Sequence, residues 1–297
     1  MQSLNEIRHH IRAIDQTRKI TNAMYLVASS RMKRVLSHVD YSRSYFHKVE
    51  DTLQDILSTS AGLSHPYLSE RADARHTYVV VGGDKGMAGA YNSQLLHFAW
   101  EQICGQDNPR VITVGIMASR FFRHKGLLPE MEFFEISQDP SLFNARHITT
   151  EILSLYDRDE TDRVYVIYTS FHSAAHYTPV LRQLLPLGLD AGAEPDGHKP
   201  PPQLLYEPSP KAVFNLLTPQ YLIGVLFCAL VQAYASEHCA RMNAMRSATE
   251  NADEMLQKLQ LQYNLARQGA ITREITEIAG AAQALGQMDQ VRPTEGS

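Results

Sequence analysis

The chain has 297 residues, 44% of them hydrophobic, so it is long enough to bury one large core or two ordinary ones. Its formal net charge of −4 excludes the chain-wide positive field that is typical of proteins whose main partner is nucleic acid. The three cysteines, Cys104, Cys228 and Cys239, are too few and too widely spaced for a disulfide framework or a C-x-x-C metal site.

The first 60 residues contain neither proline nor glycine, and their aliphatic side chains recur at the period of a helix. Ser3 and Glu6 fit a capping box at its start. A helix over residues 3–57 would extend on the order of 80 Å at 1.5 Å per residue, which is too long for one small domain to surround. Between residues 8 and 34 the basic side chains far outnumber Asp15, the one acidic residue, so this segment is either a solvated helix face or a surface that slides against acidic loops of a partner.

We expect no direct insertion into a membrane. The opening residues alternate charged and aliphatic side chains, which matches neither a signal peptide nor a transit peptide. The most apolar stretch, residues 221–231, has about half of the ~20 residues that a membrane-spanning helix requires.

The middle of the chain predicts an open, Rossmann-like α/β sheet. Every proline except Pro293 lies between residues 66 and 219, so helix breakers are concentrated here. Residues 77–83, 110–116 and 163–171 are short β-branched or aromatic runs that are typical of buried strands. Residues 186–203 are rich in proline and glycine and indicate an exposed loop.

The glycine-rich segment GGDKGMAGAYN, residues 82–92, raises the possibility of a phosphate-binding loop, because such turns expose backbone amides to anions. Lys85 is not followed by serine or threonine, and the glycine spacing does not give G-x-G-x-x-G. A structural turn between a strand and a helix is therefore favoured. No compact metal-ligand set and no G-x-S-x-G nucleophile motif is present, so we expect no catalytic residue, no cofactor and no metal.

The last third of the chain predicts a second long helix, from Ser209 or Pro219 to about Leu285. Alanines four residues apart at 244, 248 and 252 allow a neighbouring helix to approach closely. The two long helices are expected to pair as an antiparallel coiled coil, since a whole domain separates them. The predicted parts are an N-terminal helix (1–60), a central α/β domain (61–208), a C-terminal helix (209–288) and a flexible tail (289–297).

Two segments resemble the gamma subunits of F-type ATP synthases. TRKITNAMYLVASSRMKR, residues 17–34, is similar to the family's opening helix, and residues 236–285 resemble its closing helix almost throughout, including A-R-M, Y-N-x-A-R-Q and I-T-x-E-[IL]-x-E-I. In the middle, GGDKGMAGAYNSQL and LLYEPSPKAVF have counterparts in the same order. The sequence departs from the family pattern at Asn22, Lys85 and Ala88, and at Pro219, which is predicted to interrupt the second helix.

The resemblance implies a non-catalytic rotor shaft that couples proton or sodium flow to ATP synthesis or hydrolysis. Its implied partners are three alpha and three beta subunits around one copy of this chain, an epsilon subunit and the membrane c-ring. Its implied place is peripheral, on the cytoplasmic face of a bacterial inner membrane.

The resemblance also implies three sets of functional residues. Contacts that couple the shaft to the beta subunit are expected at Arg267, Gln268, Met24 and Arg241. A bearing tip that turns inside a hydrophobic sleeve is expected at Ile278, Ala281, Ala282 and Leu285. The foot contact with the membrane ring is expected at Tyr206 and Glu207.

Packing within the shaft is the alternative role for the first two sets, and a plain turn is the alternative for the third. Two other functions stay open from the residues alone. One is a coiled-coil adaptor that holds two partners apart, and the other is an enzyme with a nucleotide-binding α/β domain.

Overall fold

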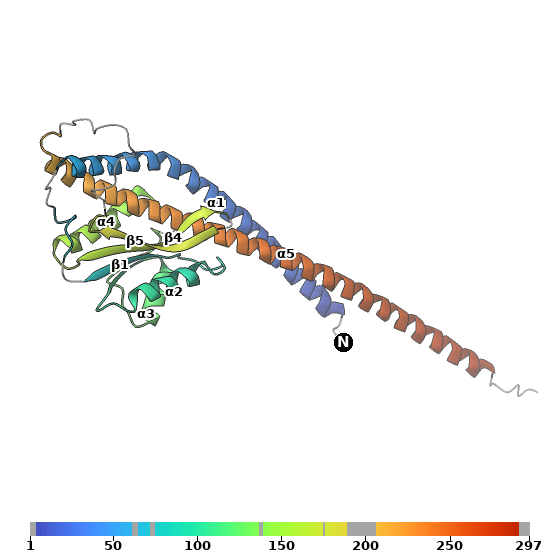
Figure 1. The fold of residues 1–297 in the computed structure, drawn as a ribbon. Coiled ribbons are helices and arrows are strands. Elements are labelled where there is room, and N and C mark those ends of the chain that lie inside the picture. The colour runs from blue at the N-terminus through green and yellow to red at the C-terminus, as the bar shows by residue number, and fades with distance from the viewer. Residues whose placement is uncertain are drawn as a thin grey trace, which may run out of the picture. The chain divides into compact units, whose positions relative to one another are not determined.

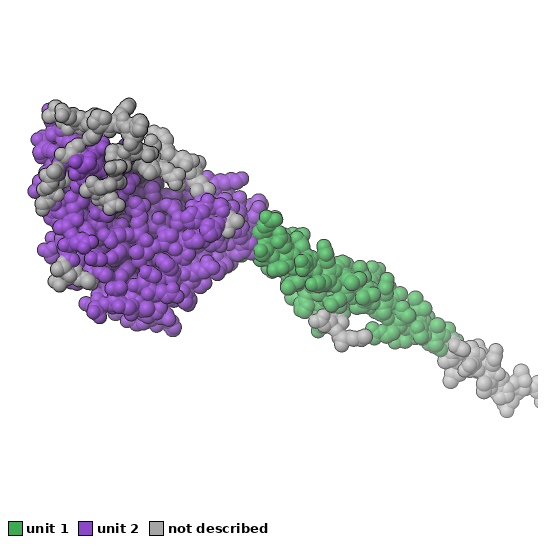
Figure 2. All heavy atoms as spheres, viewed as in Figure 1, with its two compact units in different colours: residues 1–24, 245–297 green, residues 25–244 purple. Residues whose placement is uncertain are grey.

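The computed structural model describes residues 4–60, 65–71, 75–136, 139–174, 176–188 and 206–290. The chain divides into two compact units, one of residues 1–24 and 245–297 and the other of residues 25–244 (Figure 2). Ser3 of the predicted capping box, most of the predicted loop 186–203 and the end of the tail lie outside the described residues.

A five-stranded sheet forms the centre of the unit of residues 25–244, with the strand order β3-β2-β1-β4-β5. The first four strands are parallel and β5 runs antiparallel to β4. The strands are β1 (His76–Val81), β2 (Arg110–Val114), β3 (Met131–Phe133), β4 (Arg163–Ser173) and β5 (His176–Leu185). Three predicted strands, β1, β2 and β4, are thus confirmed.

Sequence analysis missed β3 and β5, the two edge strands. Strand β3 has only three residues, too few for a pattern. Strand β5 contains Pro179, which lacks the N–H that a central strand needs and is tolerated at the edge of a sheet.

Helices cover both faces of the sheet (Figure 1). Helices α2 (Tyr91–Ile103) and α3 (Ile116–His124) pack on one face in a core that includes Val80, Leu95 and Phe122. Helix α4 (Leu142–Asp157), the end of α1 and the first part of α5 share a larger core with the other face. Burial on both sides explains why β1 and β2 are almost continuously apolar.

Two long helices, α1 (Leu4–Thr59) and α5 (Pro210–Gln290), contribute to both units. In the unit of residues 1–24 and 245–297, they are antiparallel, because Arg8 pairs with Tyr263 and Thr21 with Thr249. In the unit of residues 25–244, they are also antiparallel. There the Tyr221 hydroxyl donates to Glu50, 3.1 Å away, and Phe46 lies against Gly224.

The predicted interruption at Pro219 is wrong, since α5 continues through it. Helix α5 begins at Pro210, where the Ser209 hydroxyl accepts a hydrogen bond from the Ala212 amide, 3.2 Å away. An internal proline costs about 3 kcal/mol, but each large apolar side chain buried nearby returns about 1.5–3 kcal/mol. Phe214, Leu222 and Leu226 are all buried, so tertiary packing outweighs the local cost.

Helix α5 is also the one helix among the described residues that has a stretch long and apolar enough to cross a membrane. That stretch is longer than sequence analysis had recognised. Most of it is buried inside the protein, so packing in the core accounts for its hydrophobicity.

Candidate functional site

The glycine-rich turn after β1 lies at the carboxyl edge of the parallel strands, beside the point where strand order reverses between β1 and β4. Open α/β sheets commonly bind ligands at such a point. Here the polar groups of the turn bond within the domain. The Gly83 amide donates to Asn92 Oδ1 at 3.0 Å, and Asp84 Oδ1 accepts from the Ile116 amide at 3.0 Å.

Helix α5 closes this crevice with a buried carboxylate. A Cβ atom built on Gly83 would lie 3.0 Å from the Glu237 carboxyl group, so a larger residue at this position would crowd that side chain. Burial raises the pKa of Glu237, and the neighbouring Arg241 opposes that shift. A carboxyl group against the turn disfavours the approach of a phosphate.

Arg241 is held within the chain in this structure. It forms an ion pair with Glu237 one helical turn earlier, and the two side chains are 12% and 7% exposed. Arg241 also donates to the Gly86 carbonyl at 3.3 Å and to His238 Nδ1 at 3.2 Å. Burial and the nearby positive charges lower the pKa of His238 to about 3, so its ring is neutral and can accept that bond.

The other three predicted coupling residues lie in the unit of residues 1–24 and 245–297. Arg267 and Gln268 are exposed on α5, and Met24 is half-buried on α1. Both side chains of the exposed pair are open to solvent, and their coupling role stays a prediction.

The predicted bearing tip lies near the end of α5. Ile278 is 64% exposed, and Ala281 and Ala282 are exposed as well. Leu285 is helical, but its side chain lies outside the described residues. Exposure is thus described for Ile278, Ala281 and Ala282, and their role as a bearing tip stays a prediction.

The predicted foot residues precede α5. The Tyr206 ring packs against the large core, and its hydroxyl is buried without a hydrogen-bond partner among the described residues. Burial raises the pKa of Tyr206. Glu207 is exposed. Tyr206 is half-buried, so the two neighbours differ in how far they are exposed to solvent.

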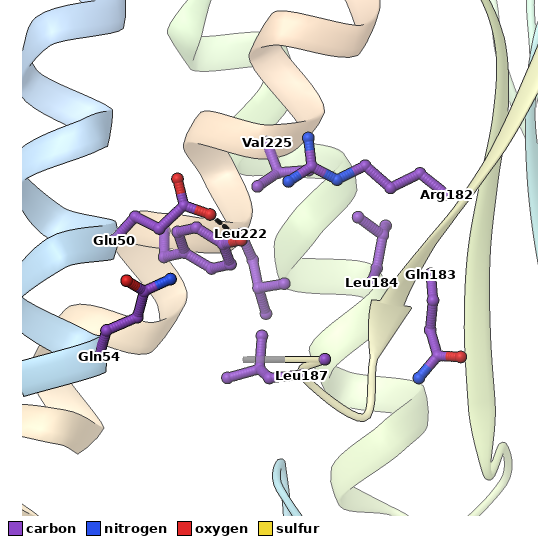
Figure 3. Close-up of a pocket in the computed structure, with 10 residues that line it drawn as sticks. Glu50, Gln54, Arg182, Gln183, Leu184, Leu187, Leu222 and Val225 are labelled. Atoms are coloured by element: carbon purple, nitrogen blue, oxygen red, sulfur yellow. Dashed lines mark hydrogen bonds between the residues drawn. The ribbon is translucent and has the colours of Figure 1, made fainter. Parts of the chain in front are cut away.

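Figure 3 shows a separate cleft of about 290 Å³ between α1, β5 and α5. Its lining includes the apolar side chains of Leu184, Leu222 and Val225 and the charged side chains of Glu50 and Arg182. No residue of the three predicted sets lines it. Among the described residues, no group of three or more His, Cys, Asp or Glu side chains could hold a metal ion.

Sequence analysis missed Glu237 and His238 as members of a polar cluster. Both precede Arg241 by about one turn of a continuous helix, so the spacing of an ion pair was visible. Their burial against the glycine-rich turn was not visible, because some 150 residues separate the two segments.

The whole chain is similar to gamma chains of ATP synthase. Residues 3–285 match the family model described as ATP synthase. The ATP synthase gamma chain of Ruminiclostridium cellulolyticum is 39% identical over 290 residues, covering 95% of this chain and 99% of that one. The corresponding chain of Heliobacterium modesticaldum is 36% identical over 290 residues, covering 96% and 100%.

Solved structures share the fold. A chain in the mitochondrial ATP synthase of Euglena gracilis aligns with a TM-score of 0.69 at 18% identity, covering 99% of this chain and 98% of that one. A chain of the central stalk and c-ring of the Tetrahymena thermophila enzyme aligns with a TM-score of 0.61 at 24% identity, covering 77% and 99%. With relatives above 30% identity along nearly its whole length, this chain belongs to the ATP synthase gamma chain family.

Proposed function

We propose that this chain is the central rotor shaft of an F-type ATP synthase. It couples ion flow across a membrane to ATP synthesis or hydrolysis in a surrounding catalytic ring. The chain carries no catalytic site of its own, and its asymmetric shaft biases the catalytic sites of its partners.

The observation that carries this proposal is the bare end of α5. Arg8, close to the start of α1, already pairs with Tyr263, and residues 271–282 of α5 are exposed throughout. Large apolar side chains are exposed along this helix: Met255, Leu261, Leu265, Ile271, Ile275 and Ile278. An isolated helix with exposed apolar side chains is only marginally stable in water. We therefore expect a partner protein to surround this segment.

The proposed partners follow from the family. Three alpha and three beta subunits form the ring around the helix pair, with Arg267 and Gln268 contacting a beta subunit. Ile278, Ala281, Ala282 and Leu285 turn in the sleeve of the ring. An epsilon subunit and the membrane c-ring bind the α/β domain, and Glu207 is the exposed residue of the foot segment.

We place the chain on the cytoplasmic face of a bacterial inner membrane, as a peripheral subunit. The similarity to bacterial gamma chains supports this assignment. Residues 1–60 and 209–288 act as the shaft and residues 61–208 as the foot.

The test is co-expression with cognate alpha and beta subunits, purification of the assembly, and an ATPase assay with and without this chain. We expect three alpha, three beta and one copy of this chain, with sustained hydrolysis only when the chain is present. Failure to join the ring would favour a coiled-coil adaptor instead.

Two matched variants test the coupling residues in the same assembly. Arg267→Ala is expected to reduce hydrolysis by about thirtyfold or more, because truncating one partner of a charge pair buried in an interface costs at least about 2 kcal/mol. Arg158→Ala, which removes an exposed arginine of the α/β domain, serves as the control. Equal activity of the two variants would remove Arg267 from the coupling contact.

A further inference from the structure

A short segment of α5, residues 232–243, carries a run of polar contacts to the α/β domain; we call it the joint segment. Its Ala233 carbonyl accepts from the Tyr91 hydroxyl at 3.1 Å, and its Ser236 hydroxyl donates to the Thr169 carbonyl at 3.2 Å. Asn243 donates to the Ala174 carbonyl at 3.1 Å. These bonds reach β4, the turn after it and the first residue of α2, so they hold the helix at several points.

The earlier part of α5 packs on the sheet and on α4 mainly through apolar side chains such as Leu222, Leu226 and Leu230. Apolar contact is non-directional, so rotation of the helix about its own axis is opposed there only by the interlocking of side chains. Hydrogen bonds have preferred distances and angles, so they fix that rotation. The joint segment is therefore the part of α5 best suited to set its rotational position in the domain.

The buried Glu237–Arg241 pair lies at the centre of the joint segment. Glu237 lies close to Gly83, and Arg241 donates a hydrogen bond to the Gly86 carbonyl. The pair therefore contacts the glycine-rich turn at two points. The turn also projects outward, since Lys85 and Met87 are exposed and Met87 has φ of 62°. A charge-assisted bond is the strongest kind available for holding such a turn.

We propose that residues 232–243, centred on Glu237 and Arg241, form the joint that transmits turning force between the shaft helix and the α/β domain. This inference rests on the proposed rotor function. Glu237 and Arg241 act here as positioning residues. They fix the orientation of α5 relative to the glycine-rich turn, so that when one of them rotates the other rotates with it.

The test uses the complete ATP synthase in membrane vesicles, with the double variant Glu237→Gln/Arg241→Met. Removing both members avoids an unpaired buried charge, and replacing a buried ion pair by neutral groups of similar volume is often tolerated. The matched control is Arg246→Met/Glu250→Gln, an exposed ion pair four residues apart on the same helix, with its atoms 3.0 Å apart. Arg241→Lys, which keeps the charge but loses the fork geometry, is the milder third variant.

Three quantities are measured: ATP hydrolysis, ions pumped per ATP hydrolysed, and amide hydrogen exchange of residues 84–90. In the double variant we expect faster exchange in the turn and fewer ions pumped per ATP hydrolysed than in the wild type, whatever its rate of hydrolysis. Arg241→Lys should give a pumping ratio and an exchange rate between those of the double variant and the wild type. The control variant should match the wild type in both.

Faster exchange in the turn with an unchanged pumping ratio would overturn the joint and leave the pair a purely structural role. If the double variant does not assemble, Arg241→Lys decides, and a wild-type pumping ratio in that variant would also overturn the proposal. A wild-type chain that fails to join the ring would instead refute the rotor function, and the joint with it.

Discussion

Gly224 tests how α1 and α5 pack in the unit of residues 25–244. A Cβ atom at this position would lie 2.0 Å from Cδ1 and 2.4 Å from Cε1 of the Phe46 ring. Carbon atoms in contact are about 3.5–4.0 Å apart, so the ring would have to retreat by more than about 1 Å. The Phe46 ring therefore packs in the space that a side chain at position 224 would occupy.

Two opposing terms set the effect of Gly224→Ala. Alanine gains about 1 kcal/mol over glycine in a helix interior. Overpacking typically costs about 1–3 kcal/mol, and an overlap this severe lies at the upper end. We expect a net loss of about 1–2 kcal/mol in the free energy of unfolding, because the clash exceeds the gain in helix propensity.

The assay is urea unfolding of the full-length chain, followed by fluorescence of Trp100, its single tryptophan, and by helix circular dichroism. In a Phe46→Ala background the clash disappears, so Gly224→Ala should become stabilising by up to about 1 kcal/mol. Gly269→Ala is the control, since nothing lies within 4 Å of its added Cβ, and it should gain helix signal. A stabilising Gly224→Ala in the wild-type background would refute the packing described for Phe46.

Three further predictions concern stability of the full-length chain in the same urea assay. Arg75 bonds the buried Asp162 carboxylate through both oxygens at 2.9 Å and lowers its pKa below the ordinary 3.8, so Asp162→Asn should cost about 2 kcal/mol at neutral pH. That stability is present above the unfolded pKa and is lost as pH falls through the folded one, so the deficit of the variant should shrink below about pH 4; a constant deficit would contradict the role of the charge. His238, with a folded pKa of about 3 against 6.5 unfolded, contributes stability that is present above pH 6.5 and is lost as pH falls from 6.5 toward 3. The wild type should therefore lose up to about 1.4 kcal/mol more per pH unit than His238→Gln across that window, and parallel pH profiles would argue against a buried neutral ring. Ser209→Ala removes the cap of α5 and should lower stability by about 1 kcal/mol, which Ser209→Thr should largely restore.

Sequence alone determined the features that depend on near neighbours in the chain. The absence of proline and glycine from the first 60 residues, together with the aliphatic period, predicted α1, because a helix forms from contacts three and four residues apart. The β-branched runs predicted β1, β2 and β4, since these strands are buried on both faces. The closing-helix motifs identified the family.

Tertiary structure decided the features that depend on residues far apart in the sequence. Helix α5 continues through Pro219 because buried neighbours outweigh a local penalty that the sequence shows by itself. Arg241 had been assigned from its motif to a partner, yet the fold engages it with Glu237 and the Gly86 carbonyl. No local pattern encodes that contact, because the direction and burial of a side chain are set by what packs against its helix.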